Sequence, residues 1–138
     1  MFDFTKKRVA ETGDIIIKEA DGSPMLDDEG KEVTVTVYSP GSKVWQQADA
    51  EQNRKRAERM RKNGGKIEAA LDNVIADKID FLCRITVRFN GSGTHQVDKG
   101  VDAIRAVYSD DEIGYIRDHV YEEAHDWGNF TKKGSVKA

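Results

Sequence analysis

The chain has 138 residues and a mass of 15.5 kDa, which is enough for one domain with a modest core but not for two domains with separate cores. Charged residues make up 34% of the chain, yet 25 acidic residues nearly balance 22 basic ones, and the formal net charge is only −3. This balance excludes a polyelectrolyte that binds its partners by bulk charge.

Two further features of the sequence predict the cellular compartment of the protein. It has no run of 18 apolar residues that could cross a membrane, and Lys6, Lys7 and Arg8 are not followed by the apolar segment of a secretory signal. Cys83 is the only cysteine, so it cannot form a disulfide within the chain, and three scattered histidines do not complete a zinc site with it. We therefore expect no membrane contact, no cofactor and a reducing cytoplasm.

The first predicted elements are two strands that form an antiparallel meander over residues 14–38. Isoleucine occupies positions 15, 16 and 17, and β-branched valines alternate with polar residues from Val33 to Val37. Asp21-Gly22 and Glu29-Gly30 mark turns between the two strands.

A basic helix is predicted next, over residues 42–62, with Ser42 as its N-cap. Residues 51–62 contain six basic and two acidic side chains, a local charge of +4, and apolar residues gather only at the two ends of the helix. Because most helical stability in proteins comes from burying an apolar face, we expect a partner to supply part of the packing. The predicted partner-binding residues, with their arginines exposed, are Trp45, Arg54, Arg56, Arg59 and Met60.

The strongest helical periodicity predicts a core helix over residues 66–89. Ile85, Val87 and Phe89 also alternate as in a strand, but the helix is favoured because Ile85 and Phe89 continue the four-residue spacing. This helix is expected to share one core with the C-terminal helices. The predicted core residues are Leu71, Val74, Ile75, Ile79, Leu82, Ile104, Ile116 and Val120.

A pair of helices is predicted over residues 97–127, the second opened by a capping box at residues 109–112 and stopped by Gly128. Its buried stripe is expected to reach Trp127, and residues 131–138 should form a flexible tail. The predicted fold class is α+β, a small antiparallel meander followed by a bundle of about four helices, in a single domain over residues 1–130.

Catalytic patterns are sparse. The best metal-like cluster, His119, Glu122, Glu123, His125 and Asp126, has its histidines six residues apart and facing different ways, so a solvated acidic face is favoured. Cys83 lies within an apolar stripe and is more readily a small buried hydrophobe than a nucleophile. No acid, base and nucleophile arrangement stands out, so an enzyme is not expected.

Nucleic acid is the less favoured partner of the basic helix. The helix has no interleaved aromatic residues, and the sequence pI of 5.6 lies well below the value above about 9 that is typical of nucleic-acid-binding domains. A solvated face or an acidic protein partner is the better interpretation.

In its order of elements, the chain resembles the tail assembly chaperones of long-tailed, siphovirus-like bacteriophages. The shared order is a short β N-terminus, a Ser-Pro-Gly turn into a basic helix, and an apolar helix that ends near Phe89-Asn90-Gly91. Relatives often have a tryptophan before this glycine, where the present chain keeps an aromatic residue in Phe89. Residues 81–130 carry the more specific motifs, above all Ile116-Arg117, two residues and Val120, followed by a closing Asn129-Phe130. The other matching positions are Val101, Ala103, Ile104, Val107, Tyr108, Ser109, Ile113, Gly114, Tyr115, Asp118, His119, Trp127 and Gly128.

The resemblance implies a late, non-catalytic viral protein that binds the tape measure protein and recruits tail tube subunits. It also implies a location in the host cytoplasm and absence from the mature virion. Two alternatives stay open: a virion structural protein at the head-tail joint, and a small DNA-binding regulator that uses the basic helix. The sequence also leaves open whether the chain forms a homo-oligomer.

Overall fold

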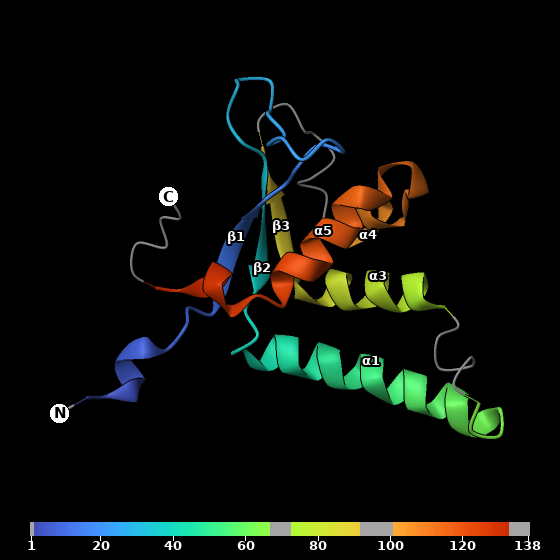
Figure 1. Ribbon diagram of the computed structural model, residues 1–138. Coiled ribbons are helices and arrows are strands. Elements are labelled where there is room, and N and C mark those ends of the chain that lie inside the picture. Colours follow the sequence, from blue (N-terminus) through green and yellow to red (C-terminus); the bar gives the residue numbers. More distant parts are fainter. Residues whose placement is uncertain (1, 67–72, 92–100, 133–138) are drawn as a thin grey trace.

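The computed structural model describes residues 2–66, 73–91 and 101–132, and within them the chain has an α+β fold. Strands β1 (Thr12–Ile16), β2 (Thr34–Tyr38) and β3 (Thr86–Asn90) form an antiparallel sheet in the order β1-β2-β3. Within the described residues, four α-helices accompany it: α1 (Lys43–Lys62), α3 (Val74–Ile85), α4 (Val101–Ser109) and α5 (Gly114–Ala124). In Figure 1, α1 and α3 run side by side below the sheet, and α4 and α5 lie above α3.

The antiparallel pairing of the first two strands confirms the predicted meander, with Ile15 opposite Val35. The predicted helix over residues 66–89 is wrong at its end, because the chain passes at Thr86 from α3 directly into β3. Phe89 then lies opposite Val35 on the buried side of the sheet. The alternation of Ile85, Val87 and Phe89, which also fitted a strand, was therefore the better guide, because the sheet offered these side chains a partner strand.

The basic helix starts as predicted. The Ser42 hydroxyl accepts a hydrogen bond from the Trp45 backbone N–H at 3.2 Å, and α1 ends at Lys62 before two glycines with positive φ. The second C-terminal helix starts differently, because Asp110 rather than Ser109 provides the cap. That cap opens a 3₁₀ turn, Asp111–Ile113, from which α5 continues, and α5 ends at Ala124, before Gly128.

One apolar core lies between the sheet and the helices. It confirms four of the predicted core residues, because Leu82, Ile104, Ile116 and Val120 are buried, while Ile79 packs at its margin. The prediction of burial is wrong for two others, because Ile75 is 50% exposed and Val74 is 37% exposed. Both lie in the first turn of α3, at the end of the helix farthest from the sheet (Figure 1), where few core residues can reach them. Leu71 lies outside the described residues.

The C-terminal residues close the core against β1. Phe130 is 1% exposed and belongs to a 3₁₀ turn, Trp127–Phe130. A Cβ atom at Gly13 would lie 2.6 Å from its ring, so only glycine allows this approach. Two expectations here are corrected: Trp127 is 55% exposed rather than buried, and Thr131 pairs with Val9 instead of starting a flexible tail. Residues 133–138 lie outside the described residues.

Candidate functional site

The predicted partner-binding residues lie on α1, which packs chiefly against α3. Trp45 lies at the start of the helix and Met60 near its end, about 22 Å apart at 1.5 Å per residue. The five predicted residues therefore do not form one compact patch, and their roles must be described separately.

Trp45 anchors the start of α1 in the core. Its indole Nε1 donates a hydrogen bond to the Ala124 carbonyl at 3.1 Å, and its ring meets Phe81 edge-on at a centroid distance of 5.3 Å. His125 lies against both rings. The half-buried tryptophan thus has an internal structural role.

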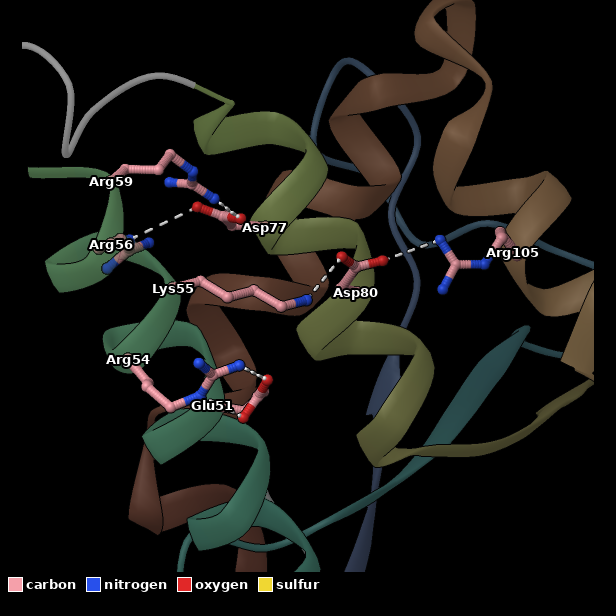
Figure 2. A network of polar contacts seen from close by, with 8 residues as sticks. All are labelled: Glu51, Arg54, Lys55, Arg56, Arg59, Asp77, Asp80 and Arg105. Atoms are coloured by element: carbon pink, nitrogen blue, oxygen red, sulfur yellow. Dashed lines mark hydrogen bonds and ion pairs between the residues drawn. The ribbon is translucent and has the colours of Figure 1, made fainter. Parts of the chain in front are cut away.

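Arg56 and Arg59 both turn toward Asp77 of α3, as Figure 2 shows. The Asp77 side chain is only 3% exposed; its Oδ1 accepts from Arg59 Nη2, and Arg56 Nε lies 3.9 Å from its Oδ2. The side chains of Arg56 and Arg59 are 33% and 23% exposed. The expectation that these arginines are exposed is therefore wrong, because a buried carboxylate on the neighbouring helix requires their charge.

A second carboxylate of α3 links three helices. Asp80 accepts hydrogen bonds from Lys55 of α1 at 3.3 Å and from Arg105 of α4 at 3.0 Å (Figure 2). Partial burial tends to raise the pKa of Asp80, but the hydrogen bonds from Arg105 and Lys55 more than offset this and hold its pKa below the ordinary value. The local charge of +4 on α1 is thus partly matched inside the fold.

Arg54 does meet the expectation of exposure. Its side chain is 63% exposed, and it pairs with Glu51 one turn earlier on the same helix. Arg61 pairs with Glu58 in the same way and is 70% exposed. The outward-facing surface of α1 therefore presents alternating charges whose hydrogen bonds and ion pairs lie within α1 itself.

The contact between α1 and α3 is unusually polar for a helix pair. The buried residues of α1 are Ala48 and Gln52. Tyr121 donates to Gln52 Oε1 at 3.2 Å, but Gln52 Nε2 and Asp77 Oδ2 are buried with no hydrogen-bond partner among the described residues. Buried polar groups without partners cost free energy, so the second half of α1 is held against α3 chiefly by its ion pairs, while Trp45 and Ala48 provide apolar packing at its start.

The C-terminal motif has a structural explanation that sequence reasoning missed. Arg117 is 6% exposed, and its Nη1 donates to the Tyr108 carbonyl at 3.3 Å, which ties α5 to the end of α4. A Cβ atom at Gly114 would lie 2.8 Å from Arg117 Nη2, so this glycine makes room for the guanidinium. Asp111 and Asp118 lie 3.6 and 3.2 Å from it.

The candidate metal-binding and nucleophilic residues have other contacts. His119 Nε2 lies 3.1 Å from the Ile16 carbonyl, and His125 Nδ1 lies 2.7 Å from the Tyr121 carbonyl. Within residues 2–66, 73–91 and 101–132, no group of three or more histidine, cysteine or acidic side chains could hold a metal ion. Cys83 is half-buried, and burial raises the pKa of its thiol.

One sequence signal could have located the charged contact. Asp77 and Asp80 are three residues apart, so they lie on neighbouring positions of one helix surface. A basic helix preceding such a pair predicts pairing within the chain as readily as binding to a partner. The apolar stripe of α3, with Phe81, Leu82 and Ile85 in the core, carries no information about this pair of carboxylates.

Acidification should weaken the link through Asp80. Since the pKa of Asp80 is lower in the folded protein than in the unfolded chain, the unfolded chain takes up the proton first, and stability is lost as the pH falls below about 4. Because the residue is partly exposed, the contribution should stay below about 1 kcal/mol. Asp80→Asn is expected to lower the melting temperature slightly at pH 7 and to reduce the loss between pH 6 and pH 3. Asp28→Asn, in an exposed turn, is the matched control and should follow the unaltered protein.

No helix in the described part of the chain is both long enough and apolar enough to span a membrane. Comparison with protein-family models, with curated proteins and with solved structures found no match to this chain.

Proposed function

We propose that this chain is a tail assembly chaperone of a long-tailed bacteriophage, a non-catalytic protein that binds the tape measure protein and recruits tail tube subunits. The observation that carries the proposal is the sequence pattern of residues 81–130, which resembles the ending of that family. Ile104, Tyr108, Ile116, Arg117, Val120 and Phe130 of this pattern are buried. A shared pattern of packing residues supports a shared fold, and the function is inferred from that fold by analogy.

The surface that we assign to the client is the outward-facing side of α1. Arg54 and Arg61 are exposed there, each beside a glutamate, and mixed charge of this kind favours fast and reversible association. Trp45, Arg56 and Arg59 contribute indirectly, because their internal contacts hold α1 in place. Met60 is half-buried near the end of the same helix.

Phosphate binding is the weaker interpretation of the basic helix. Lys55, Arg56 and Arg59 already contact carboxylates of α3, so a DNA backbone would compete with pairs within the fold. A DNA-binding regulator would bind duplex DNA at low salt with an affinity that falls steeply as salt rises. We expect no such binding.

Co-expression with the tape measure protein encoded by the same genome tests the proposal. The unaltered chain should keep that protein soluble and co-purify with it in the host cytoplasm, whereas mass spectrometry of purified particles should not detect the chain. Arg54→Glu with Arg61→Glu should weaken co-purification at an unchanged melting temperature. Lys6→Glu with Lys7→Glu, two exposed bases in a 3₁₀ turn near the N-terminus, Phe4–Lys7, is the charge-matched control.

Three results would contradict the proposal. Failure of the unaltered chain to co-purify would remove the chaperone function. Recovery of the chain from particles in fixed stoichiometry would favour a component of the head-tail joint. Equal loss of co-purification in both double variants would show that the outward side of α1 is not the specific contact.

A further inference from the structure

Strand β1 is an edge of the sheet, and its free side opens into a groove. On one side β1 pairs with β2, and on the other the groove has a volume of about 640 Å³, within the range of about 300–1,000 Å³ common for binding sites. Its lining comes from β1, from His119 and Glu123 of α5, and from Asn129 to Lys132. All of these residues lie within the described part of the chain.

The register of β1 against β2 determines which backbone groups face the groove. The Ser39 N–H donates to the Glu11 carbonyl and the Ile17 N–H donates to the Val33 carbonyl, so odd-numbered residues of this strand hydrogen-bond toward β2. In an antiparallel pair the intervening residues point the other way. The N–H and C=O groups of Thr12, Asp14 and Ile16 therefore face the groove.

Contacts at the two ends of the groove agree with this direction. The Ala10 N–H donates to the Phe130 carbonyl at 2.8 Å, and His119 Nε2 lies 3.1 Å from the Ile16 carbonyl. Between them, the N–H and C=O groups of Thr12 and Asp14 have no partner among the described residues. Two backbone N–H donors and two C=O acceptors are therefore exposed along the edge of β1, at the spacing of residues in a strand. A peptide that adds to a sheet edge as a further strand binds to such a row of groups.

The side chains of the groove favour a cationic residue in the middle of the added strand. Asp14 and Glu123 line its middle; the Asp14 carboxylate accepts a hydrogen bond from Thr36 through Oδ1 and the Glu123 carboxylate accepts one from Asn129 through Oε1, which leaves the second oxygen of each for a cation. The two lysines belong to its ends, because Lys18 follows β1 and Lys132 follows the residue that pairs with Val9. Opposite charges across neighbouring strands stabilise their pairing. The charge pattern is thus complementary to an extended peptide with a central lysine or arginine.

A second copy of this chain fits the groove less well. Its own α5 and residues 129–132 would flank its β1 in the same way, so the flanking residues of both copies would have to fit between the two edges. A single extended segment brings no second set of flanking residues.

We propose that the edge of β1 is a binding site for an extended polypeptide segment, which adds as a further strand at Thr12 and Asp14 and places a basic side chain near Asp14 and Glu123. The site is separate from the outward side of α1, and the proposal does not rest on the function proposed above.

The test titrates the ¹⁵N-labelled full chain with a seven-residue capped peptide, Ser-Thr-Val-Lys-Val-Thr-Ser, and follows backbone amides by NMR. The expected result is saturable shifts and slower hydrogen exchange at Thr12, Asp14 and Ile16. A peptide N-methylated at alternate residues should not bind, because it cannot complete the hydrogen bonds. Replacing its lysine with glutamate should weaken binding at least fivefold.

The matched variant is Thr12→Pro, which removes one outward N–H, since proline is tolerated on the free side of an edge strand. It should lose at least tenfold in affinity with unchanged shifts elsewhere; if it fails to fold, the N-methylated peptide tests the same bonds from the ligand side. Shifts outside the groove, equal binding of the methylated peptide, or no shift at millimolar peptide would overturn the proposal. So would concentration-dependent shifts at these amides without peptide, which would identify a second copy as the occupant.

Discussion

Leu82→Ala is expected to lower the free energy of unfolding by about 2–5 kcal/mol, the range for truncating a fully buried leucine. Leu82 is 0% exposed and lies in α3 between the sheet and the C-terminal helices. Its removal would leave a cavity that Phe81 and Ile85, both equally buried, cannot fill without leaving their own positions. Denaturant titration at pH 7 measures the loss.

Ile75→Ala is the matched control on the same helix. Because Ile75 is 50% exposed, its truncation should cost less than about 1 kcal/mol. The apolar stripe in the sequence predicts equal costs at the two positions, whereas the structure predicts a difference of more than about 1 kcal/mol. Equal losses would show that the first turn of α3 is buried after all.

Arg59→Ala is expected to be the most damaging change in the charged contact, at about 3 kcal/mol. It removes the hydrogen-bonded partner of Asp77 and leaves a carboxylate that is 3% exposed with Arg56 alone, 3.9 Å away. Breaking a buried pair from one side costs about 3–5 kcal/mol, because the remaining charge is uncompensated. The low end of this range applies, because the guanidinium of Arg59 is partly exposed.

Two controls separate this effect from a general loss of positive charge. Arg54→Ala removes an exposed base paired only within α1 and should change stability by about 0.5 kcal/mol or less. The double variant Arg59→Leu with Asp77→Leu should recover most of the loss, because it removes both charges and leaves apolar side chains in their place. Equal losses in Arg54→Ala and Arg59→Ala would contradict the buried pair.

The sequence alone predicted an element correctly wherever the local pattern of apolar residues matched the side that is buried in the structure. Alternation predicted the pairing of β1 with β2, Ser42 marked the start of α1, and the spacing of Ile116 and Val120 identified the buried side of α5. It was also sufficient for the α+β class, because two local periodicities in one chain of this length leave few other architectures. These features depend on near neighbours in the chain.

Only the tertiary structure decided whether residues 85–89 form a helix or a strand, and which charged side chains pair with one another. The pattern of residues 85–89 fits both a helix, which the spacing favours, and a strand, which the structure adopts because Phe89 pairs opposite Val35 of β2. From the sequence, Arg56 and Arg59 were predicted to bind a partner protein, whereas in the structure they pair with Asp77 of α3. The outward backbone groups of β1 became a candidate site only because, among the described residues, neither α5 nor residues 127–132 pair with Thr12 and Asp14 on that side. In each case the physical reason is the same: the deciding contact joins residues that are far apart in the chain, and neither periodicity nor local charge contains that information.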